Sequence, residues 1–216
     1  SDILPNKEIP TNTILNKTLT GCGATYGEIV HAKRHSIIIE PNVPVILGKK
    51  AEHPFLFAVY EGITKEDVKA YLAGEHDGYR KIITTPEGFD KKVLPAMREL
   101  EIPVYKDYFL LFDECEKAIQ DVGYRGDIYL PVEDFFKFEN KAMVSATPII
   151  PSDPRFEENG FKVLKLVPTY DSRIDLTLCT TNNTVAVMRK LLKRLENETV
   201  FVFLNSTETI LNLILA

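Results

Sequence analysis

The sequence has few cysteines and no long apolar run. Its three cysteines, Cys22, Cys115 and Cys179, are odd in number and widely spaced, with no C-x-x-C pair. This pattern argues against a disulfide framework or a structural zinc site and favours a reducing compartment. No apolar run approaches the roughly 20 residues of a membrane-spanning helix, and the N-terminal SDILPNKEIP lacks a basic-then-apolar signal pattern. We therefore expect a cytoplasmic protein without a membrane segment.

The sequence also lacks an excess of positive charge. Its formal net charge is -5 and its pI is near 5.5, which argues against a wholly basic nucleic-acid coat but is compatible with a local basic groove. With 216 residues, 44% of them hydrophobic and 26% charged, the chain can bury a sizeable core. That length predicts one domain plus part of another.

The most informative stretch is LLFDECEKA, residues 110–118. The apolar residues before Asp113 predict a buried strand, so Asp113 and Glu114 fall where that strand ends. In open α/β sheets, ligands bind at this carboxyl edge. An alternative interpretation is that the two acidic residues only cap the helix that follows, because carboxylates suit a helix N-terminus.

The same plan of an apolar strand followed by a polar or proline-broken loop occurs five times. The four other copies lead into the Gly-rich turn at 20–25, into Glu-Pro-Asn at 40–42, into Thr-Thr-Pro at 84–86 and into Ser-Ala-Thr-Pro at 145–148. The intervening segments are long enough to supply crossover helices. The sequence therefore predicts an α/β fold whose parallel sheet has one functional edge.

Other segments are predicted to form scaffold elements. A capping-box-like start at Thr64 predicts a helix through Leu72 that Gly74 ends, and Pro95 is expected to interrupt or end the helix after Pro86. The remaining expected elements are strands at 161–167, 174–180 and 199–204 and helices at 185–195 and 207–216.

A composition change after residue 151 indicates a domain boundary, which we place between residues 168 and 169. The first domain then comprises residues 1–168, and residues 169–216 form a crossing segment and the start of a second unit. About 45 residues are too few for an ordinary independent domain. We therefore expect the chain to be cut from a longer one.

Taken in order, these segments resemble motifs I, Ia, Ib, II and III of the superfamily 2 DExD/H-type nucleic-acid helicases. The segments are the turn at 20–25, SIIIEPN, ITTPEGF, LLFDECEKA and VSATP. The resemblance covers roughly residues 10 to 168, and TVFVFLNS at 199–206 resembles motif IV. It implies a RecA-like P-loop NTPase, a three-layer α/β sandwich with a mainly parallel central sheet. It also implies that a second RecA-like lobe begins near the end of this chain.

The resemblance assigns roles residue by residue. It implies ATP and Mg²⁺ as cofactors, with Asp113 holding the magnesium, Thr25 supplying a hydroxyl to it, and Glu114 orienting the attacking water. The nucleotide-binding residues it implies are Thr20, Gly21, Cys22, Gly23, Ala24 and Thr25. Residues expected to couple nucleotide state to nucleic acid are Ser145, Ala146 and Thr147, and those expected to contact a nucleic-acid backbone are Pro41, Asn42, Thr85 and Pro86. Each Ser or Thr taken alone is also explained by ordinary turn chemistry.

The sequence departs from the family at the phosphate loop, where Gly23-Ala24-Thr25 stands in place of Gly-Lys-Thr. The missing lysine would contribute on the order of 1.5 to 3 kcal/mol of phosphate binding, which corresponds to roughly ten- to a hundredfold in affinity. Hydrolysis is more sensitive, because loss of one preorganised donor costs about a hundred- to a thousandfold in rate. Lys17 and Lys33 are nearby candidates for a substitute, although their spacing does not require it.

Two functional classes follow. The first is an ATP-dependent DNA or RNA helicase or translocase, with Asp113 and Glu114 as its catalytic residues. The second is a non-hydrolysing, helicase-like module that binds nucleic acid or a partner protein, as the alanine at position 24 indicates. Another P-loop enzyme such as a kinase is a third class, and the Ser-Ala-Thr segment after the acidic pair counts against it.

Overall fold

The computed structural model describes residues 8–18, 21, 23–115, 132–147, 153–167, 177–195, 198–203 and 206–214. The chain divides into two compact units, Ser1–Tyr170 and Asp171–Ala216. Within the described ranges, no helix combines the length and the apolar composition needed to cross a membrane.

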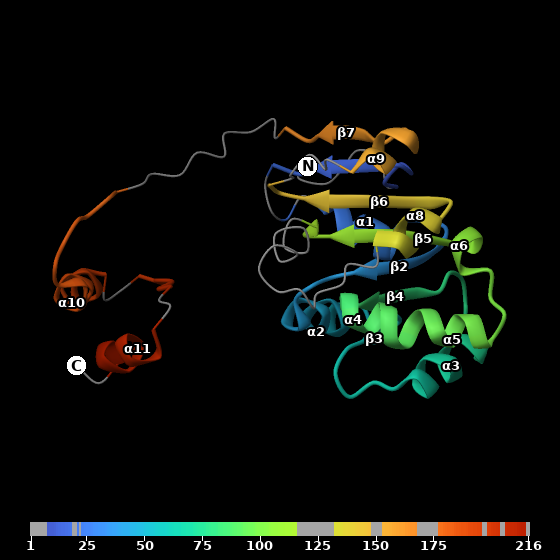
Figure 1. Ribbon diagram of the computed structural model, residues 1–216. Helices are drawn as coiled ribbons and strands as arrows, with labels where there is room; N and C mark the ends of the chain where they lie inside the picture. Colours follow the sequence, from blue (N-terminus) through green and yellow to red (C-terminus); the bar gives the residue numbers. More distant parts are fainter. Residues whose placement is uncertain are drawn as a thin grey trace. The chain divides into compact units, whose positions relative to one another are not determined.

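The first unit is built on a seven-stranded sheet (Figure 1). Its strands are β1 (Thr13–Asn16), β2 (His35–Ile39), β3 (Phe57–Val59), β4 (Lys81–Thr84), β5 (Tyr108–Asp113), β6 (Asn140–Ser145) and β7 (Lys162–Lys165). Their order in the sheet is β3-β4-β2-β5-β6-β1-β7, and every pair of neighbours is parallel. The carboxyl ends of all seven strands therefore meet at one edge, as the sequence predicts.

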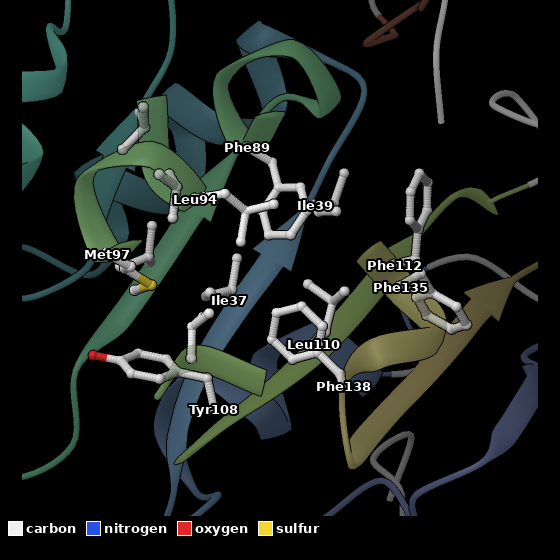
Figure 2. Packing of buried hydrophobic residues seen from close by; sticks show 14 of the residues in the cluster. Ile37, Ile39, Phe89, Leu94, Met97, Tyr108, Leu110, Phe112, Phe135 and Phe138 are labelled. Atoms are coloured by element: carbon white, nitrogen blue, oxygen red, sulfur yellow. The ribbon is translucent and has the colours of Figure 1, made fainter. Parts of the chain in front are cut away.

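Side chains of the central strands alternate between two separate cores. On one face, Ile37 and Leu110 belong to a cluster that includes Phe89, Met97 and Phe138 (Figure 2). The helical segments that contribute to this cluster are α3 (Lys65–Ala73), η1 (Phe89–Val93), α5 (Leu94–Glu99), α6 (Val104–Asp107), α8 (Val132–Lys137) and α9 (Pro154–Glu158). The short helix α4 (Pro86–Gly88) leads directly into η1. Because the side-chain period of a strand is two residues, this cluster takes every second residue of β2 and β5.

The opposite face of the sheet carries the second core. Ile38 of β2 and Leu111 of β5 pack here with Ile29 and Ile46, which come from α1 (Ala24–Val30) and α2 (Val43–Glu52). Helices therefore cover both faces of a parallel sheet, and the central strands β2 and β5 are buried on both sides. These layers confirm the predicted fold class at the level of a three-layer α/β sandwich with a parallel central sheet.

Two predicted helices are observed with the signals that the sequence indicates. The side chain of Thr64 accepts a hydrogen bond from the backbone N–H of Asp67, which completes a capping box at the start of α3. Gly74 follows the end of that helix. Pro95 interrupts but does not end the other helix, because the π-helical segment η1 precedes it and α5 continues to Glu99. The wider π turn accommodates a ring that has no N–H to donate.

The second unit contains α10 (Thr184–Arg194) and α11 (Thr207–Ile214), and both helices agree with the sequence. The predicted buried strand at 199–204 is wrong for its described part: residues 199–203 form no strand, and Phe201 and Phe203 are 93% and 83% exposed. Residues 177–180 of the other predicted strand are also not in a sheet. Strands need hydrogen-bonded neighbours, and the described part of this unit offers only helices. The interpretation of this unit as the start of a second RecA-like lobe stays a prediction.

Candidate functional site

The Gly-rich turn connects β1 to α1 at the carboxyl edge of the sheet. Gly21 and Gly23 have φ angles of 78° and 79°, a left-handed conformation that glycine adopts without strain. Gly23 is the N-cap of α1, so Ala24 and Thr25 are its first helical residues, and both are buried. Two predicted nucleotide-binding residues, Thr20 and Cys22, lie outside the described residues.

The acidic pair lies at the end of β5, the central strand of the edge. Asp113 is the last residue of the strand and is 3% exposed. Glu114 follows with a left-handed φ of 49°, which is uncommon for a residue with a side chain. The chain turns sharply here, so the two neighbouring carboxylates have different surroundings: that of Asp113 is buried, whereas Glu114 is half-buried.

Asp113 contacts side chains from three other parts of the first unit. The hydroxyl of Thr25 donates to Asp113 Oδ2, Lys17 Nζ lies 3.1 Å from Oδ1, and Lys49 Nζ of α2 lies 3.4 Å from Oδ2. The backbone N–H of Glu114 also donates to Oδ1, at 3.0 Å. A role in capping the next helix does not account for these contacts with Thr25 and two lysines.

The electrostatics of Asp113 favour its charged form. Burial raises the pKa of a carboxyl group, but the positive charges of Lys17 and Lys49, together with hydrogen bonds from Thr25 and Lys17, outweigh it. The net result is that the pKa of Asp113 lies below its ordinary value. The structure therefore holds an ionised carboxylate with two ammonium groups beside it.

Lys49 and Asn42 connect Asp113 to two further carboxylates, Glu40 and Glu114, at the same edge of the sheet. Lys49 Nζ lies 3.4 Å from Glu40 Oε2 as well as from Asp113. The side-chain amide of Asn42 donates to Glu114 Oε2 at 2.9 Å and to Glu40 Oε1 at 3.3 Å. Asn42, predicted to contact nucleic acid, thus contacts the predicted catalytic base directly.

Glu40 provides a pH-dependent test of this arrangement. Burial raises its pKa, and nearby Asp113 and Glu114 raise it further, although Lys49 and the backbone N–H of Asn42 oppose the shift. A carboxyl group with a raised folded-state pKa stabilises the fold fully below its unfolded pKa, and this stability is lost as pH rises through the folded-state value. We therefore expect Glu40→Gln to gain stability relative to the parent between pH 4.5 and pH 8.

Urea denaturation of Glu40→Gln and the parent at both pH values measures this effect. The difference between their midpoints should shift in favour of the variant at pH 8. A difference that does not change with pH would contradict the expectation. Glu52→Gln, on the exposed end of α2, is the matched control, and its difference from the parent should not depend on pH.

The remaining predicted residues occupy the same edge but make mainly local contacts. Ser145 is fully buried and its Oγ accepts the backbone N–H of Thr147 at 3.0 Å. Thr85 caps α4 by accepting the N–H of Gly88 at 3.0 Å. Ala146, Pro41 and Pro86 are half-buried. The register places β2 between β4 and β5, so Thr85 lies two strands away from Asp113.

Sequence reasoning did not identify Glu40 or Lys49 as members of the site. Glu40 carries the same signal that identified Asp113, since it is the first polar residue after a buried strand. Lys49 follows Asn42 by seven residues, and this spacing is two helical turns, which returns to the same face of α2. The register pairs Ile39 with Phe112, so the residues that follow them are brought together only by the sheet.

The donors at this edge are compatible with a magnesium nucleotide. Mg²⁺ takes oxygen ligands, usually one or two carboxylates plus phosphate oxygens and water, and Thr25 and Asp113 supply a hydroxyl and a carboxylate. Within the described ranges, no group of three or more His, Cys, Asp or Glu residues is placed to hold a metal ion. A dedicated all-protein metal site is therefore not found there, whereas a shared site with a phosphate ligand fits these residues.

No protein family matches the sequence, and no curated protein matches it. Among solved structures, one similar chain is the helicase domain of Hef from Pyrococcus furiosus, with 16% identity over 74% of this chain and a TM-score of 0.45. The match covers 35% of that chain, so this protein spans about a third of its length. The α/β fold class follows from the sheet order itself.

Proposed function

We propose that the first unit is a helicase-like lobe that binds ATP and Mg²⁺ between the Gly-rich turn and Asp113. The observation that carries this proposal is the hydrogen bond from Thr25 to Asp113, two residues 88 positions apart. Folding places one at the start of α1 and the other at the end of β5. A P-loop hydroxyl beside a strand-end carboxylate is what a shared magnesium site requires.

The chemistry divides between the two adjacent acidic residues. Asp113 is ionised and faces Thr25, so these two hold the metal end of the nucleotide. Glu114 is directed to Asn42 instead, and its proposed role is to orient a water molecule. Mg²⁺ held by Thr25 and Asp113 would neutralise negative charge on the phosphates. Two carboxylates with different partners thus serve two functions at one edge of the sheet.

The proposed activity of the whole protein is ATP-dependent movement on, or unwinding of, DNA or RNA. Support comes from the order of the five motifs and from the Asn42–Glu114 contact, which links a predicted backbone-binding residue to the predicted base. Backbone contacts at Pro41, Asn42, Thr85 and Pro86 would not read bases. Closure of a second lobe over this edge would exclude water from the nucleotide.

Phosphate release from the full-length protein, with and without single-stranded nucleic acid, tests this activity. We expect release to rise with nucleic acid and to fall about a hundred- to a thousandfold in Glu114→Gln, by analogy with loss of one preorganised catalytic group. Parent protein that releases no more phosphate than Glu114→Gln would exclude hydrolysis.

A non-hydrolysing module is the second candidate, favoured by Ala24 and by the two lysines beside Asp113. These ammonium groups already neutralise the carboxylate that would hold magnesium. Such a module would bind single strands with a strong dependence on salt and no effect of nucleotide. Unwinding of a duplex with ATP would exclude this candidate.

A further inference from the structure

Two lysines reach the nucleotide edge although position 24 carries alanine. Lys17 Nζ lies 3.1 Å from Asp113 Oδ1, and Lys49 Nζ lies 3.4 Å from Oδ2. Lys33, the other nearby lysine, is exposed and follows the end of α1. Seven helical residues span about 10 Å, so α1 separates Lys33 from the turn at its start.

We propose that Lys17 replaces the missing phosphate-loop lysine, and that a bound nucleotide draws its ammonium group from Asp113 to the terminal phosphates. This inference rests on the proposed nucleotide site. It relocates the phosphate-binding charge from the start of α1 to the residue that directly follows β1. The site would then still contain a phosphate-binding lysine although position 24 is alanine. That lysine precedes the Gly-rich turn at 20–25, whereas Ala24 lies at the end of the turn.

The position of Lys17 is fixed at its backbone. Its N–H donates to the carbonyl of Ser145 at 2.9 Å, which continues the pairing of β1 with β6 beyond the last strand residue. The next residue, Thr18, is held as well, because its hydroxyl donates to the carbonyl of Leu166 at 2.6 Å. The backbone of Lys17 is therefore held in place, whereas the flexible four-carbon stem of its side chain allows the ammonium group to change position.

The charge of Lys17 also needs an anion. Its side chain is only 11% exposed, and a nearly buried ammonium group is costly unless it is paired. Asp113 is its anionic partner here, and a phosphate oxygen offers the same pairing. On Asp113, Lys17 faces Oδ1 and Thr25 faces Oδ2. One carboxylate thus separates this ammonium group from the hydroxyl predicted to meet magnesium.

Lys49 is less suited to the role. It pairs with Glu40 as well as with Asp113, at 3.4 Å in each case, so transfer to a phosphate would leave two buried carboxylates without their shared partner. Its side chain is more exposed, at 21%, and it projects from the second turn of α2 rather than from the segment between β1 and α1. We assign it to holding Glu40 and Asp113 together.

Calorimetric titration with Mg²⁺ and the β,γ-imido analogue of ATP tests the inference. The variants are Lys17→Met, Lys17→Arg and Lys49→Met in this chain, with circular dichroism confirming that each is folded. Lys17→Met should weaken binding by about ten- to a hundredfold. Lys17→Arg, which keeps the charge, should lose less, and so should Lys49→Met.

A double variant provides a rescue that a merely structural role of Lys17 would not produce. Adding Ala24→Lys to Lys17→Met should restore most of the lost affinity, because a lysine is returned to the same phosphates. An ATP analogue with an aldehyde on its terminal phosphate gives a readout without mutation. After borohydride reduction, mass spectrometry should find the label on Lys17.

The outcomes separate this inference from the proposed function. Unchanged affinity in Lys17→Met, or label on Lys49, overturns the inference and leaves the nucleotide site intact. Binding by Ala24→Lys but not by the parent also overturns it, since Lys17 would then not substitute. If neither the parent nor Ala24→Lys binds, the nucleotide site itself fails, and the inference fails with it. If Lys17→Met does not fold, the inference is decided by which lysine carries the label from the aldehyde analogue.

Discussion

Replacement of Asp113 by alanine is expected to lower the free energy of unfolding by about 3–5 kcal/mol, the typical cost of removing one partner of a buried ion pair. The change removes the carboxylate to which Lys17 and Lys49 are paired and the acceptor of the Thr25 hydroxyl. Urea denaturation at pH 7 measures the loss. Asp77→Ala, at an exposed position, is the control and should stay within about 0.5 kcal/mol of the parent.

The pH dependence of the same site identifies the cause. Because the pKa of Asp113 is lowered in the fold, its charge contributes stability above the ordinary pKa of 3.8, and that contribution is lost as pH falls through the folded-state value. Asp113→Asn, which keeps the shape, should therefore be less stable than the parent at pH 5–7. The difference should shrink only below about pH 4. Equal stability of Asp113→Ala and the parent at pH 7 would contradict this account.

The sequence predicts the strands of the first unit because each leaves a local signal. Five apolar runs end in polar loops, and parallel strands place those ends at one edge, so the contact between the turn at 20–25 and Asp113 follows once the fold class is known. The helix of α3 is equally local, since its capping box lies within four residues. A capping box or an apolar run can be recognised in a single sequence because the residues that form it are close together along the chain.

Features that depend on register or on long side chains are not predictable in this way. Lys49 meets Asp113 across 64 positions, and its spacing from Asn42 alone does not show that it reaches a residue of another strand. The predicted strand at 199–204 shows the opposite error. Its apolar residues carry a local signal, but the neighbouring strands needed to form a sheet are absent from the described part of the second unit.

A buried ion network at the opposite edge of the sheet is the clearest feature without a local signal. Glu28 of α1 is fully buried. Arg34 Nη2 lies 2.6 Å from its carboxylate, Ser36 Oγ donates to it at 2.5 Å, and Lys81 Nζ lies 3.8 Å away. Lys81 also donates to the carbonyls of Glu28 and Ala32, at 2.7 and 3.0 Å. The network ties α1, the helix that follows the Gly-rich turn, to the starts of β2 and β4.

Removal of the central carboxylate should therefore have a large effect on stability. We expect Glu28→Ala to lower the free energy of unfolding by about 3–5 kcal/mol, because Arg34 and Lys81 would lose their shared acidic partner inside the protein. Urea denaturation at pH 7 measures the loss. Glu52→Ala, an exposed acidic position on α2, is the matched control and should remain within about 0.5 kcal/mol of the parent.

Lys81 makes this loss depend on pH. Burial, together with a smaller effect of the positive charge of Arg34, lowers the pKa of Lys81 to about 8 despite the opposing charge of Glu28. Between pH 8 and its ordinary pKa of 10.5, the unfolded chain holds a proton that the folded chain does not, so stability contributed by this group rises with pH. At pH 9 Lys81 is mostly neutral with or without Glu28, and the penalty of Glu28→Ala should be smaller than at pH 7. A loss below about 1 kcal/mol at pH 7, or one that grows toward pH 9, would show that Glu28 does not hold these charges in the core.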